Sequence, residues 1–154
     1  MKKQLRLYLD TSVFGGYFES KFSKESKYVV DGLNSGRGIL ITSEILFTEI
    51  DKAPEQVREI LYTIPDKNTE FVPITDDVEK LHRAYISKKV VPAKSINDAF
   101  HVALATVSRA DAIISWNFKH IVRLDRIKGF NLVNFEMGYR DIIILSPKEV
   151  SFYE

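Results

Sequence analysis

Short apolar segments alternate along this chain with longer segments of helical periodicity, and this alternation constrains the fold more than any other feature. Strands are predicted at residues 5–9, 39–41, 71–74, 111–115, 132–135 and 141–145. Helical patterns are predicted at 28–33, 43–51, 54–62, 76–88, 95–108 and 118–127. Such alternation predicts an α/β fold with a mostly parallel sheet and helices on both faces. We expect one domain over residues 1–154, with no repeat and no linker.

The composition excludes several classes of protein. The chain has no cysteine, which rules out disulfides and thiolate metal sites and fits a reducing cytoplasm. No apolar run approaches the ~20 residues of a membrane span. The segment MKKQLRLYLDTS reaches Asp10 too early for a signal peptide. We therefore expect a cytoplasmic protein that binds no membrane. The net charge of +1 gives no overall attraction to nucleic acid, so affinity for a polyanion must come from local patches.

Four acid or amide side chains stand where a parallel sheet would bring them together. Ligands of such sheets bind beyond the carboxyl ends of the strands, where the strand order reverses. Asp10 and Asn117 each follow a predicted strand, while Glu49 and Asp98 lie on predicted helices. Oxygen ligands without cysteine or a histidine pair select a hard cation such as Mg²⁺ or Mn²⁺. The sequence therefore predicts a metal site formed by Asp10, Glu49, Asp98 and Asn117.

Glu49 is informative because of its place on a predicted helix. Ile45 and Leu46 precede it by four and three residues, so its carboxylate shares a stripe with apolar side chains. A buried carboxylate needs a partner or an opening to solvent. The alternative is a glutamate at the margin of the apolar stripe, with its carboxylate in water.

Asp98 and His101 lie one turn apart on the clearest predicted helix. The two side chains could share a cation or hydrogen-bond each other, with His101 supporting the site rather than binding metal. The competing interpretation is structural, because Ser95-Ile96-Asn97-Asp98 also matches a capping pattern.

Each remaining candidate has a structural alternative too. Asp10 would serve as a helix cap and Asn117 as a turn residue. Trp116 would simply pack. The hydroxyls of Thr11 and Ser43 could bind water or carboxylates, or cap helices.

At these residues the chain resembles the PIN-domain family over nearly its whole length. The family's opening strand and first acid resemble LYLDTSVF, with Asp10. Its second acid and the serine before it resemble ITSEILFTEI, with Ser43 and Glu49. Its third-acid helix resembles the start of INDAFHVALATVSRADAIISWNF, with Asp98. The resemblance implies a three-layer α/β/α fold. It also implies a Mg²⁺- or Mn²⁺-dependent ribonuclease, often the toxin of a VapBC toxin–antitoxin pair, with an antitoxin partner and a homodimeric state. Many members have a fourth acid where this chain has Asn117.

The chemistry expected is phosphodiester hydrolysis by metal-activated water, which needs no covalent nucleophile. RNA as the substrate comes from the resemblance, because this chemistry does not use a 2′-hydroxyl. Five basic residues are predicted to contact its phosphates: Lys88, Lys89, Lys94, Lys119 and Arg123. Two other functions remain open. One is a PIN-fold binding module without catalysis, and the other is a small-molecule phosphatase that uses Asp10 as a nucleophile.

Overall fold

The computed structural model describes residues 4–152, which form a five-stranded sheet with all pairs parallel. The central strand is β1 (Leu5–Leu9), between β2 (Gly38–Thr42) and β4 (Ala112–Ile114). The edge strands are β3 (Thr69–Phe71) and β5 (Ile144–Leu145), in the order β3-β2-β1-β4-β5. Because the chain moves outward from β1 in both directions, the strand order reverses between β1 and β4. A ligand site is expected beyond the carboxyl ends of these two strands.

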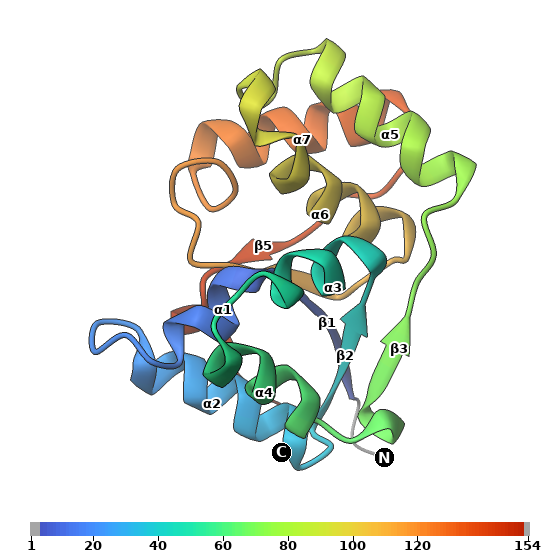
Figure 1. The fold of residues 1–154 in the computed structure, drawn as a ribbon. Helices are drawn as coiled ribbons and strands as arrows, with labels where there is room; N and C mark the ends of the chain where they lie inside the picture. Colours follow the sequence, from blue (N-terminus) through green and yellow to red (C-terminus); the bar gives the residue numbers. More distant parts are fainter. Residues whose placement is uncertain (1–3, 153–154) are drawn as a thin grey trace.

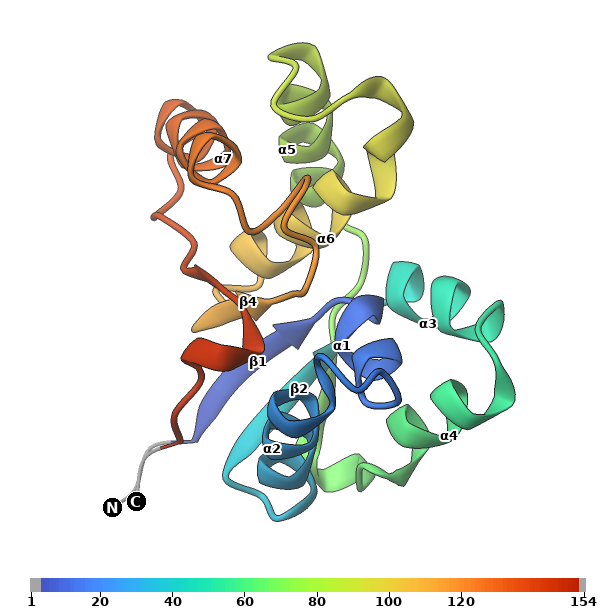
Figure 2. The ribbon, with the colours of Figure 1, turned by 90° about the vertical axis from the view of Figure 1, so that its left-hand side faces the viewer.

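Helices cover both faces of the sheet, as Figures 1 and 2 show. One face packs against α1 (Thr11–Gly16), α2 (Ser23–Asn34), α3 (Glu44–Asp51) and α4 (Glu55–Thr63). The other packs against α5 (Asp76–Ser87), α6 (Ile96–Val107) and α7 (Leu124–Glu136). Short 3₁₀ turns lie at Asp66–Asn68, Ala93–Ser95 and Pro147–Glu149. The three-layer α/β/α prediction is thus confirmed. None of the helices within residues 4–152 is long and apolar enough to cross a membrane.

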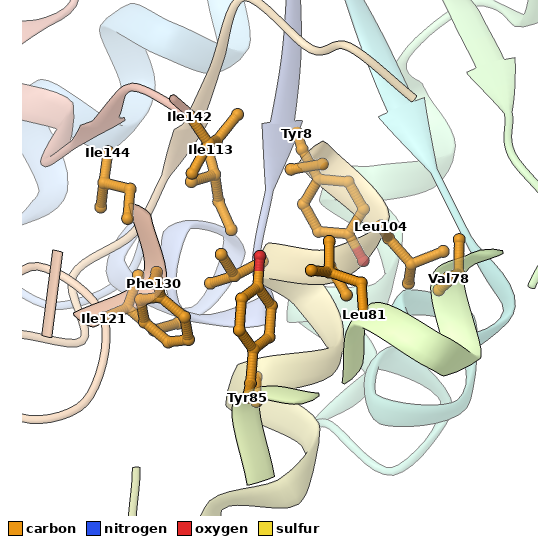
Figure 3. Packing of buried hydrophobic residues seen from close by; sticks show 14 of the residues in the cluster. Tyr8, Val78, Leu81, Tyr85, Leu104, Ile113, Ile121, Phe130, Ile142 and Ile144 are labelled. Carbon is orange, nitrogen blue, oxygen red and sulfur yellow. The ribbon is translucent and has the colours of Figure 1, made fainter. Parts of the chain in front are cut away.

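Two apolar cores lie on the two faces of β1. Leu7 and Leu9 point into the core beneath α1–α4, while Tyr8 points into the core beneath α5–α7. Figure 3 shows Tyr8 entering this second core, where Tyr85 of α5 and Phe130 of α7 also pack. Strand residues alternate between faces, so a strand with large apolar residues at successive positions must be covered on both sides.

Several elements differ from the sequence prediction. Residues 132–135, predicted as a strand, belong to α7, and residues 118–123 form turns before that helix begins at Leu124. A short apolar run does not distinguish a strand from a helix segment. In the helix, Val133 is buried, whereas Leu132 and Phe135 face outward. The third strand was predicted at 71–74 but spans Thr69–Phe71, so it ends before Pro73; its position at a sheet edge is as predicted. The last strand, predicted at 141–145, is limited to Ile144–Leu145.

Hydroxyl side chains stand at the N-cap positions of three helices, and only two of them make a capping hydrogen bond. The hydroxyls of Ser43 and Thr75 accept hydrogen bonds from backbone N–H groups three residues on, as capping side chains do. Ser95 stands at the N-cap position of α6, but its side chain makes no capping bond. Its hydroxyl lies 3.2 Å from Nδ1 of His120 instead. The capping interpretation of the Ser95–Asp98 segment is therefore wrong.

Candidate active site

Asp10 follows β1 at the point where the strand order reverses. The residue is buried, with a relative exposure of 5%. It occupies the N-cap position of α1 without making a capping bond. Its Oδ1 instead accepts a hydrogen bond from Ser12 at 2.5 Å, and its Oδ2 accepts one from Ser115 at 2.9 Å. The helix-cap alternative is therefore excluded, and the carboxylate is held by two hydroxyl donors.

The two serines connect the loops that follow β1 and β4. Ser12 Oγ accepts the backbone N–H of Trp116 at 2.9 Å, and Ser115 Oγ accepts that of Asn117 at 2.9 Å. Each hydroxyl thus accepts a hydrogen bond from a backbone N–H and donates one to the carboxylate of Asp10. This arrangement fixes the orientation of the carboxylate while it remains ionised.

Burial raises the pKa of Asp10 to about 6, against the pull of His101 and the hydrogen bonds from Ser12 and Ser115. The negative charge of Glu49 raises it further. Burial in a low-dielectric region disfavours a charged carboxylate, and so does a second anion nearby. A cation placed against both carboxylates would relieve both penalties. A strongly perturbed acid at the mouth of a parallel sheet is therefore a good candidate for function.

Glu49 lies on α3 at the end of a buried chain of hydrogen bonds. Its Oε1 is 2.5 Å from the hydroxyl of Thr11, which donates, and 2.6 Å from Nε2 of His101. Nδ1 of His101 lies 2.6 Å from the hydroxyl of Tyr8, which in turn lies 2.7 Å from that of Ser43. All partners are satisfied when Ser43 donates to Tyr8, Tyr8 to His101 and His101 to Glu49.

The environment favours the ionised form of Glu49. Partial burial raises its pKa, but hydrogen bonds from His101, Thr11 and Asn97 and the electrostatic attraction to the imidazole of His101 outweigh that effect, so the pKa is lowered. Its side chain remains one-quarter exposed, which leaves it accessible from solvent. The need for a partner predicted from the apolar stripe is met by His101, so Glu49 is not simply a marginal surface residue.

Asp98 has a different partner from the one expected. It lies in the first turn of α6, and its Oδ2 is 3.2 Å from Nδ1 of His120. The predicted hydrogen bond between Asp98 and His101 is therefore wrong, because the imidazole of His101 contacts Glu49 and Tyr8 instead. Two histidines thus serve two different acids.

Asn117 closes the turn that follows β4. Its Oδ1 accepts the backbone N–H of His120 at 2.9 Å and of Lys119 at 3.2 Å. Such contacts are those of a turn asparagine, the structural alternative given for Asn117 from the sequence. Because the same turn carries His120 to Asp98, Asn117 influences an acid of the site without touching it. Its role as a metal ligand stays a prediction.

The donors at this edge suit a hard cation only in part. Asp10 and Glu49 offer carboxylate oxygens, and Glu49 is close enough for its charge to raise the pKa of Asp10. Within residues 4–152, however, no three acidic or histidine side chains are arranged as a set that could hold a metal ion. Asp98 would join the other two through its second oxygen or by leaving His120. The oxygen chemistry fits Mg²⁺ or Mn²⁺, and the gathering of the third acid stays a prediction.

The other predicted site residues are placed as follows. Trp116 packs in the core beneath α1–α4, and its Nε1 donates to Ser26 at 2.8 Å, so its side chain has a packing role. Arg123 is bound to Asp125 by two hydrogen bonds of 2.6 and 2.7 Å. All five side chains predicted to bind RNA are exposed, and Nζ of Lys88 lies 3.9 Å from a carboxylate oxygen of Glu136. Lys94 borders an open pocket with Asp98 and His120.

Sequence reasoning missed Tyr8, Ser12 and Ser115 as parts of this site, and it did not assign His120 to Asp98. Ser12 lies two residues after Asp10, and Ser115 directly follows β4. Their positions just after two strands could have identified both serines as neighbours of the site. Tyr8 looked like an ordinary strand residue. Its hydroxyl becomes significant only because the strand's second face meets His101.

Comparison with known proteins places the chain among recognised folds. A family model described as PIN domain matches residues 7–126. The structure is similar to FitAcB from Neisseria gonorrhoeae, with a TM-score of 0.57 and 12% identity over 94% of this chain and 99% of that one. It is also similar to VapBC2 from Rickettsia felis bound to a DNA fragment from their promoter, with a TM-score of 0.55 and 14% identity over 92% and 98%. VapC20 from Mycobacterium tuberculosis, a sarcin-ricin loop cleaving toxin, gives a TM-score of 0.52 and 12% identity over 70% and 86%. No curated protein sequence matches.

Proposed function

Because the chain belongs to the PIN-domain family, whose members are typically nucleases, we propose that it is a Mg²⁺- or Mn²⁺-dependent endoribonuclease. The observation that carries the proposal is the buried Asp10 carboxylate beyond β1, which is oriented by two serines and faces the charge of Glu49. Two anions that repel each other at the mouth of a parallel sheet are stabilised by a divalent cation.

The residues divide the work in the following way. Asp10, Glu49 and Asp98 would hold the cation, and a cation bound there would supply an activated water and neutralise charge on the phosphate. Ser12 and Ser115 orient Asp10, while His101 and Thr11 keep Glu49 ionised and aimed. No side chain attacks the substrate, so the proposal requires no covalent intermediate.

We further propose that the chain acts as the toxin of a type II toxin–antitoxin pair and forms a homodimer. Support comes from the similarity to FitAcB and VapBC2 and from VapC20, whose name describes it as an RNA-cleaving toxin. At 12–14% identity these likenesses concern the fold, so the partner and the RNA must be found by experiment.

The test is an RNA cleavage assay with Mn²⁺ or Mg²⁺, run with wild-type protein, Asp10→Asn and the surface control Asp141→Asn. We expect cleavage by wild type and Asp141→Asn, and none with EDTA or with Asp10→Asn. Cleavage that survives both EDTA and Asp10→Asn would overturn the proposal.

One observation favours a second function. Asp98 is bound to His120, and residues 4–152 hold no gathered three-ligand set. A PIN-fold module that binds RNA without cleaving it would have this arrangement. It predicts that RNA is retained by the protein while no divalent cation produces cleavage.

A further inference from the structure

Three aromatic rings form a continuous row centred on Trp116, the residue whose backbone N–H is hydrogen-bonded to Ser12. The ring of Phe22, which lies just before α2, stacks on Trp116 with centroids 4.2 Å apart and planes 27° apart. The ring of Phe118 stands edge-on to Trp116, with centroids 6.1 Å apart and planes 63° apart. Trp116 is buried, but Phe118 is 47% exposed. We call these three residues the aromatic row; it has a covered centre and an open end.

The row is attached to the acid of the candidate site. The backbone N–H of Trp116 donates to Ser12 Oγ, and the hydroxyl of Ser12 donates to Asp10. Phe118 follows Trp116 by two residues in the turn that Asn117 closes. Phe118 is therefore linked to Asp10 through the backbone of Trp116 and the hydroxyl of Ser12.

Lysines accompany both ends of the row. Nζ of Lys21 lies 5.6 Å from the centroid of the Phe22 ring, a distance suited to a cation–π contact. Lys119 directly follows Phe118 and is exposed, and Lys24 is exposed at the start of α2. Glu19 is the one exposed acid between Phe18 and Lys24. The row thus combines an exposed ring with a local excess of positive charge.

We infer that the aromatic row is a stacking platform for an unpaired base of single-stranded RNA, with Lys21 and Lys119 contacting the flanking phosphates. The inference rests on the proposed function, because it places this base next to the phosphate that is cleaved. Any nucleobase offers a face for stacking, whereas phosphates need cations, and the row supplies both. A protein partner would not require lysines at both ends.

Single-stranded RNA is favoured over a duplex for a physical reason. A base in a duplex has both faces covered by its neighbours, so it cannot stack on Phe118 without leaving the helix. Stacking on an aromatic ring tolerates many base identities. The row is therefore expected to select unpaired segments rather than a particular sequence.

The binding experiment uses the full-length protein in EDTA, so that no cleavage occurs. Fluorescence anisotropy of a labelled single-stranded RNA gives the Kd of wild type, Phe118→Ala, Lys21→Ala and Lys119→Ala. The matched controls are Phe135→Ala, which removes a 77% exposed phenylalanine from α7, and Lys148→Ala, which removes an exposed lysine. Loss of base stacking should weaken binding by Phe118→Ala about tenfold or more, and each lysine variant should reduce the salt dependence of binding. The controls should bind like wild type.

A second measurement separates stacking from a purely structural effect. An RNA of the same length without bases offers charge but no ring, so wild type and Phe118→Ala should bind it equally. Trp116 is the only tryptophan, and its emission should change when the base-containing RNA binds but not when the baseless one does. Circular dichroism confirms that each variant is folded.

The outcomes are distinguishable from those of the proposed function. If wild type binds and cleaves RNA but Phe118→Ala and Phe135→Ala have the same Kd, the stacking inference is wrong and the nuclease proposal stands. If wild type neither retains nor cleaves single-stranded RNA, both are wrong. If Phe118→Ala loses affinity for the baseless RNA as well, the ring acts on structure and the inference is overturned.

Discussion

His101 and Glu49 are 52 positions apart in the chain, yet Nε2 of the imidazole lies 2.6 Å from Oε1 of the carboxylate in the interior. The same imidazole contacts the hydroxyl of Tyr8 through its other nitrogen. His101 therefore joins α6, α3 and the central strand through one side chain. A substitution of His101 should lower the stability of the fold and leave the side chain of Glu49 less ordered.

We expect His101→Ala to lower the free energy of unfolding by about 2–4 kcal/mol, because it leaves the Tyr8 hydroxyl and Glu49 Oε1 without their partner and creates a cavity. Tyr8→Phe keeps the ring and removes only the hydroxyl, so its cost should be about 1–2 kcal/mol. Urea unfolding followed by circular dichroism measures both. Equal stability of His101→Ala and wild type would contradict the role assigned to this hydrogen-bond chain.

Asp10→Asn should stabilise the metal-free protein at neutral pH while it abolishes cleavage. The carboxylate's pKa rises from an ordinary 3.8 to about 6 because of burial, which corresponds to roughly 3 kcal/mol of unfavourable ionisation in the folded state. The amide recovers part of this because it carries no charge. We expect a gain of about 1–2 kcal/mol, or a Tm higher by about 2–8 °C, in EDTA at about pH 7.5.

The same variant gives a pH signature. A folded pKa above the unfolded value means that the group's stabilising contribution is complete below about pH 4 and is lost as the pH rises through about 6. The difference in stability between Asp10→Asn and wild type should therefore grow between pH 4 and 6 and remain level above that range. Adding Mn²⁺ at neutral pH should reduce the difference. A stability difference that does not depend on pH would show that burial does not disfavour the ionised form of Asp10.

Asn117 can be tested through its turn. Its Oδ1 accepts two backbone N–H groups, so Asn117→Ala should cost about 1 kcal/mol, whereas Asn117→Asp keeps an acceptor and should cost less. Asp98→Ala removes a proposed ligand and should weaken Mn²⁺ binding, measured by calorimetry, more than Asn117→Ala does. The reverse order would make Asn117 the more important ligand and the turn incidental.

Gly16 and Gly15 form a matched pair in α1. A Cβ at Gly16 would lie 2.7 Å from Nε1 of Trp116 and 2.8 Å from Oγ of Ser26, whereas one at Gly15 would meet nothing within 4 Å. We expect Gly16→Ala to lower stability by about 1–3 kcal/mol through overpacking, and Gly15→Ala to raise it by about 0.4–1 kcal/mol. Thermal unfolding compares the two. A neutral Gly16→Ala would mean that the indole can move without cost.

Much of this architecture could be predicted from the sequence because each strand has its own local signal. Residues 5–9 form the predicted strand, and Ser43 caps its helix, one of the two roles predicted for it. The segment 132–135 was predicted wrongly because four apolar-rich residues satisfy either periodicity, and only the packing of Val133 decides between them.

The candidate site was predictable in its acids and less so in their partners. Asp10 and Glu49 could be identified because charged residues beside apolar segments stand out. The assignment of His101 to Glu49 and of His120 to Asp98 could not be identified, because it depends on how α6 rotates against the sheet. Two histidines in one region of a sequence do not reveal which acid each will meet.

The link between Asp10 and Ser115 spans 105 positions of the chain and closes only when β4 has taken its place beside β1. During translation, Asp10 leaves the ribosome long before the serine that orients it has been synthesised. A nascent chain therefore lacks an ordered first acid until most of the polypeptide has been made. For the ribonuclease proposed above, such a delay would postpone activity until the fold is nearly complete.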